Sequence, residues 1–355
     1  MKRKIPTQDK ELLDIIYRIV TKKGRDVEIK GLVDGKAGIA LFLYKYAAFM
    51  DDENVSELAN ILVEELWDSS LGSIISSNFI SGKSGFIWFF QELMNMKLVR
   101  ANEQIDKVLC NFDRSIMQQR LLNPVAIDMQ SDLFAWGLSL LKRYKAYETY
   151  QDNFDEQDKY LYKLILQEQI IYHVDECERM LHGKTLFNDV LNPRWSLRFL
   201  ASIYFFLLSA HECNIYPQKT EQLLPYILII ADGLLPHTGA SDVADVIAFE
   251  NLVSKSKPYL KTDLYWHVSN AGVLNINTAK LNPEELLDLL AEAGLYSLIY
   301  ENGSIFSCVF DFLDNRKKLL SELLTEYLKK NREKELKLSL DGLSALGYGI
   351  MSMSK

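Results

Sequence analysis

The chain has 355 residues, of which 48% are hydrophobic and 25% are charged. It is therefore long enough to bury a sizeable core, and its composition is that of a globular protein. The net charge of −8 is opposite in sign to the basic surface of most nucleic-acid-binding proteins, so we expect no nucleic-acid partner. The longest apolar run, over 197–210, is interrupted by Arg198 and is too short to span a bilayer.

The cysteines lie far apart and form no Cys-x-x-Cys pair; they are Cys110, Cys177, Cys213 and Cys308. This spacing indicates free thiols in a reducing compartment and not a disulfide framework. The chain begins with Met-Lys-Arg-Lys, and no apolar segment of the kind found in secretory signals follows. We therefore expect a cytoplasmic protein.

A glycine-containing loop followed by an apolar helix recurs along the chain. It first occurs over 31–43, after an amphipathic helix predicted over 8–20, and its helix should continue to about Met50. A second copy covers 79–90. Both copies have a Gly-Lys-x-Gly spacing, formed by Gly35, Lys36 and Gly38 and by Gly82, Lys83 and Gly85. Weaker copies follow over 127–141, 192–204, 266–275, 300–308 and 341–349. Such repetition indicates a repeat architecture.

More polar segments with helical periodicity separate the copies. They lie over 55–67, 101–119, 156–181, 218–234, 284–293 and 315–333. Two segments are predicted as connections: a Tyr-, Asp- and Gln-rich stretch over 144–160, and a long loop over 236–262 that contains two prolines and a glycine. Apolar helices that alternate with amphipathic ones predict an inner and an outer layer, with the loops at one end of the inner helices.

Some polar residues in these segments could carry chemistry. Lys36 and Lys83 lie in the repeat loops, where a solvated charge is the usual outcome and a contact with a carboxylate or substrate is the alternative. His173 and Cys177 share a helix face, but without a second pair at ligand spacing they indicate an ordinary outer helix. Cys308 follows the sixth copy and is predicted to be a buried, inert thiol, with a substitute-ligand role as the alternative.

Seven copies of this unit, spread over the whole chain, resemble the lanthionine synthetase C-like family, the LanC-type cyclases. The copies over 31–43 and 79–90 are similar to the inner-helix repeat of that family, and 340–352 is similar to its terminal repeat. The resemblance implies an all-α fold with a single domain over 1–355, an (α/α)7 toroid of seven inner and seven outer helices.

The resemblance also implies a chemistry. LanC-type cyclases close thioether rings in ribosomally made peptides. A zinc ion lowers the pKa of a peptide cysteine, and the thiolate adds to a dehydrated residue. The zinc is held by the cysteine of a Trp-Cys-Tyr-Gly unit and by both ligands of a Cys-His-Gly unit, which leaves the fourth position open for the substrate thiol.

The positions that match the family site carry other residues in this chain. His267 stands where the family has its first cysteine, and Glu301 and Asn302 stand where it has Cys-His. Asn192 replaces a family histidine that is a proposed acid/base group, whereas Asp128 retains an acidic residue. These residues are the predicted catalytic positions, with Asn302 also a substrate contact. Trp195 and Trp266, in loops at the expected ring mouth, are further predicted substrate contacts.

These substitutions predict a toroid that binds no zinc, because a neutral amide such as that of Asn302 ligates zinc weakly. A weaker metal site from His267 and Glu301 is the alternative. The predicted function is binding of a peptide substrate, or of a peptide-modifying dehydratase, during lanthipeptide maturation. One alternative is an active cyclase with an atypical site. Another is a glycosidase-like toroid that uses Asp128 and Glu301 as its two carboxylates.

Overall fold

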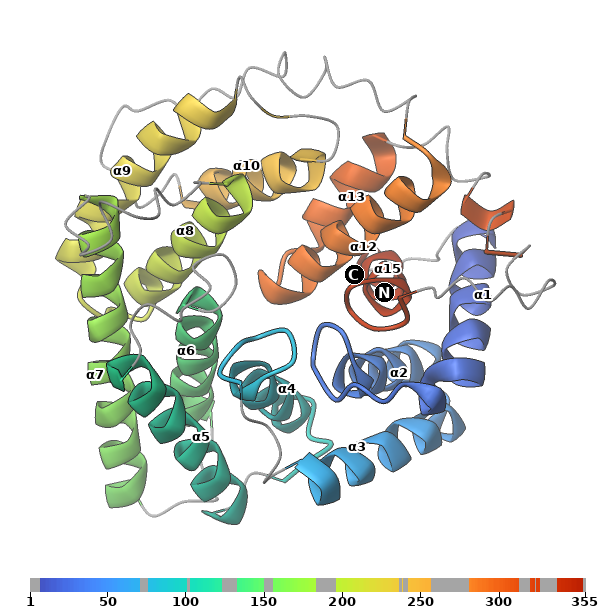
Figure 1. Ribbon diagram of the computed structural model, residues 1–355, viewed down its shortest axis with the longest axis horizontal. Coiled ribbons are helices and arrows are strands. Elements are labelled where there is room, and N and C mark those ends of the chain that lie inside the picture. Colours follow the sequence, from blue (N-terminus) through green and yellow to red (C-terminus); the bar gives the residue numbers. More distant parts are fainter. Residues whose placement is uncertain are drawn as a thin grey trace. The chain divides into compact units, whose positions relative to one another are not determined.

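A computed structural model describes residues 7–70, 76–100, 103–122, 133–149, 156–182, 196–235, 238, 242–256, 281–312, 320–322, 324–325 and 337–353. In this part of the chain the regular structure is helical throughout and contains no β-strand, which confirms the predicted all-α fold (Figure 1). Among these helices, none is both long enough and apolar enough to cross a membrane.

Contacts within the chain define two compact units. The first comprises 1–73, 238–251 and 269–355, and the second comprises 74–237 and 252–268. Helix α10 (Val243–Ser256) contributes residues to both. The prediction of one toroidal domain over 1–355 stays a prediction.

The first unit is built around two apolar helices, α2 (Lys36–Met50) and α15 (Leu343–Ser352), which pack against each other and are buried along most of their length (Figure 1). Helix α3 packs against α2, while α1, α12 and α13 pack against α15. The bounds of these four helices are Thr7–Lys23 for α1, Ser56–Ser70 for α3, Pro283–Ile299 for α12 and Gly303–Phe312 for α13. Two 3-10 turns, Gly24–Asp26 and Glu53–Val55, complete the described elements of this unit.

The first and last repeats are joined through their loops. The backbone N–H of Asp341 donates to the carbonyl of Val33 at 2.8 Å, and the hydroxyl of Ser339 donates to the carbonyl of Gly35 at 2.7 Å. These bonds place the N-termini of α2 and α15 side by side, although more than 300 residues separate them in the sequence.

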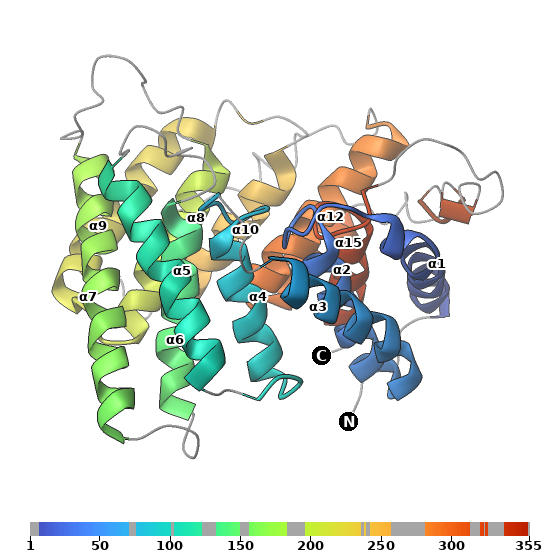
Figure 2. The same ribbon diagram turned by 60° about the horizontal axis from the view of Figure 1, so that its bottom comes forward.

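The second unit has two layers. Helices α4, α6 and α8 pack in succession, and α5, α7 and α9 pack against α4, α6 and α8 respectively (Figure 2). Their bounds are Lys83–Asn95 for α4, Glu103–Leu122 for α5, Leu133–Thr149 for α6, Glu156–Leu181 for α7, Leu197–Glu212 for α8 and Pro217–Leu234 for α9. Within this unit, apolar and amphipathic helices therefore alternate as predicted.

Helices coincide with the predicted amphipathic segments over 8–20, 55–67, 101–119, 156–181, 218–234 and 284–293. The long loop predicted over 236–262 is wrong, because α10 occupies Val243–Ser256. The breakers Pro236, Gly239 and Pro258 lie outside an apolar segment whose side chains, from Val243 to Val253, are largely buried. In the sequence, these breakers therefore stand before and after a helix and do not mark one continuous loop.

The connection predicted over 144–160 is also wrong at both described ends. Helix α6 continues to Thr149, and α7 begins at Glu156. Tyr144 and Tyr147, which contributed to the prediction of a polar surface segment, are 7% and 2% exposed. Tyrosine can bury its ring while its hydroxyl keeps a polar partner, so a Tyr-rich segment can be a helix that faces the core.

Candidate functional site

The junction between α12 and α13 carries the only predicted site residues that lie in the described part of the chain. Helix α12 ends at Ile299 with Tyr300 as its C-cap, and Glu301 then adopts the left-handed conformation with φ of 51°. The N–H of Asn302 donates to the carbonyl of Ser297 at 3.1 Å. This six-residue closure is a Schellman motif, in which glycine usually takes the left-handed position. Glu301 therefore occupies a backbone position that is costly for a residue with a side chain.

Asn302 begins the next helix. Its amide oxygen accepts hydrogen bonds from the Ser304 backbone N–H at 3.2 Å and from the Ser304 hydroxyl at 2.7 Å. A side-chain oxygen that accepts from a first-turn N–H is a helix N-cap. Asn302 thus stabilises the start of α13, and its acceptor atom is already in use.

A polar cluster extends from this cap to α10. The Ser304 hydroxyl lies 2.8 Å from the amide oxygen of Asn251, whose amide nitrogen donates to the carbonyl of Ile247 at 2.8 Å. One turn after Ser304, Cys308 is exposed, so the prediction of a buried thiol is wrong. It lies on the outer side of α13, whereas its neighbours Phe306 and Phe310 face the core.

Two ionisable groups of this cluster have raised pKa values. Partial burial raises the pKa of the Cys308 thiol. The nearby carboxylates of Asp311 and Glu250 raise this pKa further, whereas a hydrogen bond from Asn251 lowers it. Burial also raises the pKa of Glu250. A thiolate is the form that ligates metals and attacks electrophiles, so a raised pKa makes the Cys308 thiol less reactive than an ordinary exposed cysteine.

The structure therefore brings Glu301 and Asn302 together at one helix junction, with Glu301 exposed and Asn302 half-buried. The other predicted site residues lie outside the described residues; they are Asp128, Asn192, Trp195, Trp266 and His267.

Of the three positions predicted to correspond to the family's zinc ligands, only Glu301 and Asn302 lie in the described part of the chain. The described residues include no group of three histidine, cysteine, aspartate or glutamate side chains that could hold a metal ion. At the matching junction the acceptor of Asn302 serves as a helix cap, and a neutral amide is a weak zinc donor in any case. His173 and Cys177 are buried in α7, where the His173 ring packs edge-to-face on Trp136.

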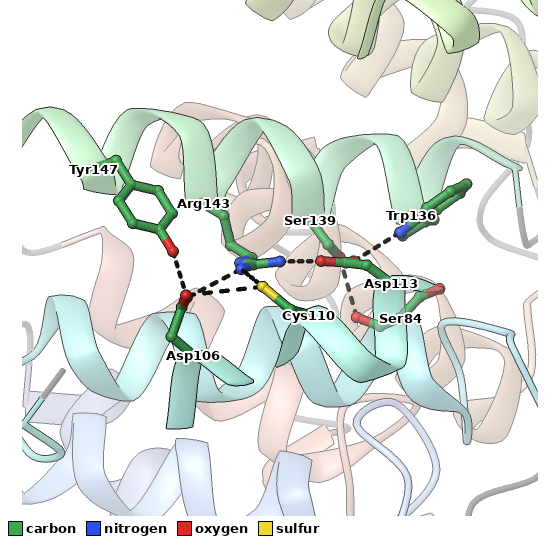
Figure 3. A network of polar contacts seen from close by, with 8 residues as sticks. All are labelled: Ser84, Asp106, Cys110, Asp113, Trp136, Ser139, Arg143 and Tyr147. Atoms are coloured by element: carbon green, nitrogen blue, oxygen red, sulfur yellow. Dashed lines mark hydrogen bonds and ion pairs between the residues drawn. The ribbon is translucent and has the colours of Figure 1, made fainter. Parts of the chain in front are cut away.

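A second polar network was not predicted from the sequence. The guanidinium of Arg143 on α6 forms ion pairs with Asp113 and, at 3.1 Å, with Asp106, both on α5 (Figure 3). Trp136 donates to Asp113 at 3.0 Å, and the Tyr147 hydroxyl donates to Asp106. Burial raises the pKa of Asp113, whereas the guanidinium and the indole N–H favour its charged form.

This network is structural. Arg143 is 1% exposed and the two carboxylates are at most 7% exposed, so none of them can meet a substrate. Their bonds connect α5 to α6 inside the second unit. A sequence signal did exist: Asp106 and Asp113, like Trp136 and Arg143, are seven residues apart and so lie on one helix face. Charges on a face that is otherwise apolar must be paired when they are buried.

Comparison with known proteins finds one family model that matches part of the chain. Residues 27–186, just under half of the chain, match the family model of lanthionine synthetase C-like protein. The matched part extends from the first repeat loop to the end of α7. No curated protein and no solved structure gives a significant match. Residues 27–186 are therefore similar to the lanthionine synthetase C-like family.

Proposed function

We propose that this chain is a LanC-like protein of ribosomal-peptide maturation that binds a peptide, or the dehydratase that modifies it, without holding the zinc of the family. The observation that carries this proposal is the cap at α13. Asn302, at the position of a family zinc ligand, uses its amide oxygen to accept two hydrogen bonds from Ser304. A ligand position that has become a helix cap supports retention of the fold without the metal.

Two further observations support the same proposal. Glu301, at the position of a family cysteine, is exposed, and the Cys308 thiol close by has a raised pKa. The family chemistry depends on thiolate ligands and on a thiolate nucleophile. The described part of this junction supplies neither, so we assign it to binding and not to thioether formation.

The proposal extends the family's toroid to the whole chain. In that arrangement the loops that precede the inner helices line a single cleft, with Asp128, Asn192 and His267 among them and Trp195 and Trp266 as peptide contacts. The cysteines are free thiols, which fits a reducing compartment, and we place the protein in the cytoplasm.

The test uses a synthetic peptide with one cysteine and one dehydroalanine. We expect the protein to bind it in fluorescence anisotropy, while the peptide thiol disappears no faster than without protein, with or without added zinc. Trp195→Ala or Trp266→Ala should weaken binding. Tyr160→Ala, which removes a ring that is 66% exposed on α7, is the matched control and should not.

Other outcomes would contradict the proposal. Zinc-dependent loss of the thiol would identify an active cyclase with an atypical site. Hydrolysis of an aryl glycoside that is lost in Glu301→Gln would identify a glycosidase-like enzyme. Failure to bind both the peptide and a co-expressed dehydratase would exclude the binding role.

A further inference from the structure

Lys83 is a buried lysine in the loop of the second repeat. It is the first residue of α4, and it is only 9% exposed, so the prediction of a solvated loop charge is wrong for it. Its ammonium donates to the hydroxyl of Ser115 on α5 at 2.7 Å. Within the described residues, no carboxylate pairs with it.

The first repeat provides an internal comparison. Lys36 is the first residue of α2 and has the same place in the Gly-Lys-x-Gly spacing. Its ammonium pairs at 2.5 Å with the carboxylate of Glu65 on α3, the next helix in the chain. In the second repeat the next helix offers the hydroxyl of Ser115 at the corresponding contact. The lysine keeps its place at the start of the helix, but among the residues that the structure describes no carboxylate stands at the corresponding contact.

This difference leaves a local charge imbalance. An ammonium has three donors, and only one of those of Lys83 is engaged by a side chain in the described structure. Burial without an opposite charge disfavours the ammonium form and lowers the pKa of Lys83. A buried, uncompensated charge costs stability, so this arrangement does not stabilise the fold.

The surrounding loop holds Lys83 firmly. Its backbone N–H donates to the carbonyl of Ser76 at 3.0 Å, and the N–H and hydroxyl of Ser84 both donate to the carbonyl of Ser77. The side chain of Asn78 accepts from the N–H of Ser81 at 2.8 Å. The loop is thus closed by its own hydrogen bonds, which fix the backbone from which the Lys83 side chain extends to Ser115.

The same bonds limit what Lys83 can bind. The first two N–H groups of α4 are already engaged by Ser76 and Ser77, so they are not available to the several oxygens of a phosphate. The remaining donors belong to one compact ammonium, which acts as a point charge. A carboxylate matches it, because one oxygen can accept from the ammonium while the other stays solvated.

We propose that Lys83 binds a carboxylate of the ligand, so that the peptide recognised by this protein presents an acidic side chain to the second repeat. The identity of the ligand as a peptide rests on the proposed function. The pairing of Lys83 with a carboxylate does not.

The test follows Lys83 directly by NMR of protein labelled with 13C at the lysine ε-carbon, with the signal assigned by its loss in Lys83→Met. The probes are N-acetylglutamate amide and, as the neutral match, N-acetylglutamine amide. We expect Lys83 to titrate at a lower pH than an ordinary lysine side chain, and the glutamate probe to shift its titration upward while the glutamine probe does not. Ser115→Glu should provide an internal partner, shift the titration upward without ligand and abolish the response to the probe.

Stability gives an independent measurement. Lys83→Met should raise the thermal midpoint because it removes a buried charge to which the described residues offer no carboxylate, whereas Lys36→Met, which removes the lysine of an ion pair, should not. The inference is overturned if Lys83 titrates like an ordinary lysine side chain, if both probes act alike, or if neither shifts its signal. Should the dehydroalanine peptide bind while Lys83 does not respond, only this inference fails. A response of Lys83 to free glutamate derivatives without peptide binding would instead overturn the proposed function and identify a small-molecule carboxylate site.

Discussion

Asn302, which is predicted to correspond to a zinc-ligating histidine of the family, caps α13 with its amide oxygen. Replacing an N-cap residue with alanine removes one first-turn hydrogen bond and costs about 1 kcal/mol. We therefore expect Asn302→Ala to lower the free energy of unfolding by roughly that amount in urea denaturation. Asn302→Asp keeps an acceptor at the same place and should retain most of the stability. An alanine variant as stable as the wild type would show that the cap contributes nothing.

Asp341 gives the chain a pH dependence that can be predicted with its sign. Burial, together with the nearby carboxylates of Asp34 and Asp288, raises its pKa to about 6 from the usual 3.8, against the opposing charge of Lys337. The folded state therefore holds this proton more tightly than the unfolded chain. The resulting stabilisation is complete below about pH 4 and is lost as the pH rises through about 6.

Asp341→Asn should consequently stabilise the protein at neutral pH. We expect a gain on the order of 1 kcal/mol at pH 7, which allows for solvent screening of a partly exposed group. Near pH 4 the gain should disappear, since the wild-type carboxyl is then protonated in the folded state. Urea unfolding at both values measures the difference. Asp232→Asn, at an exposed side chain of α9, is the control and should change little. An equal effect at both pH values would contradict the assignment.

At the scale of elements, two helices of the first unit approach each other too closely for a side chain. A Cβ atom at Gly294 of α12 would lie 2.0 Å from the backbone oxygen of Ala345 in α15. A backbone atom cannot rotate away as a side chain can, so Gly294→Ala must push the helices apart. We expect it to lower the free energy of unfolding by about 1–3 kcal/mol, the usual cost of overpacking.

The second unit contains the matched control for that substitution. Gly233 lies near the end of α9, and a Cβ atom there would meet nothing within 4 Å. Because alanine has a higher helix propensity than glycine, Gly233→Ala should be neutral or stabilise the protein by up to about 1 kcal/mol. If both substitutions had the same effect, the close packing of α12 on α15 would be in doubt.

Most helices could be predicted from the sequence because their apolar residues recur at helical spacing. Helix-breaking residues were a less reliable guide to the helix boundaries. Pro236 and Pro258 flank α10 in the sequence, and the loop predicted from them wrongly included the apolar residues between them. Exposure was also difficult to predict. Lys83 is buried and Cys308 is exposed because each depends on which neighbouring helix covers that face, and a single helix carries no such information.

For the whole molecule, the order and spacing of the repeated loop-and-helix units was the most informative feature of the sequence. It identified the family, which the match over residues 27–186 confirms, and it located Glu301 and Asn302 at a helix junction where they lie side by side. It could not reveal the ion pairs of Arg143 with Asp106 and Asp113, because these residues are 30 or more positions apart and no repeat predicts their contact. The capping role of Asn302 likewise depends on where α13 begins.

The central claim is that this chain keeps the LanC-like repeat register without the zinc site. The most direct test is the zinc content of the purified wild-type protein compared with a variant that restores the family ligands, His267→Cys, Glu301→Cys and Asn302→His. We predict essentially no tightly bound zinc in the wild type and about one zinc ion per chain in the variant, since two thiolates and one imidazole suit this metal. Stoichiometric zinc in the wild type, or none in the variant while it remains folded, would contradict the account.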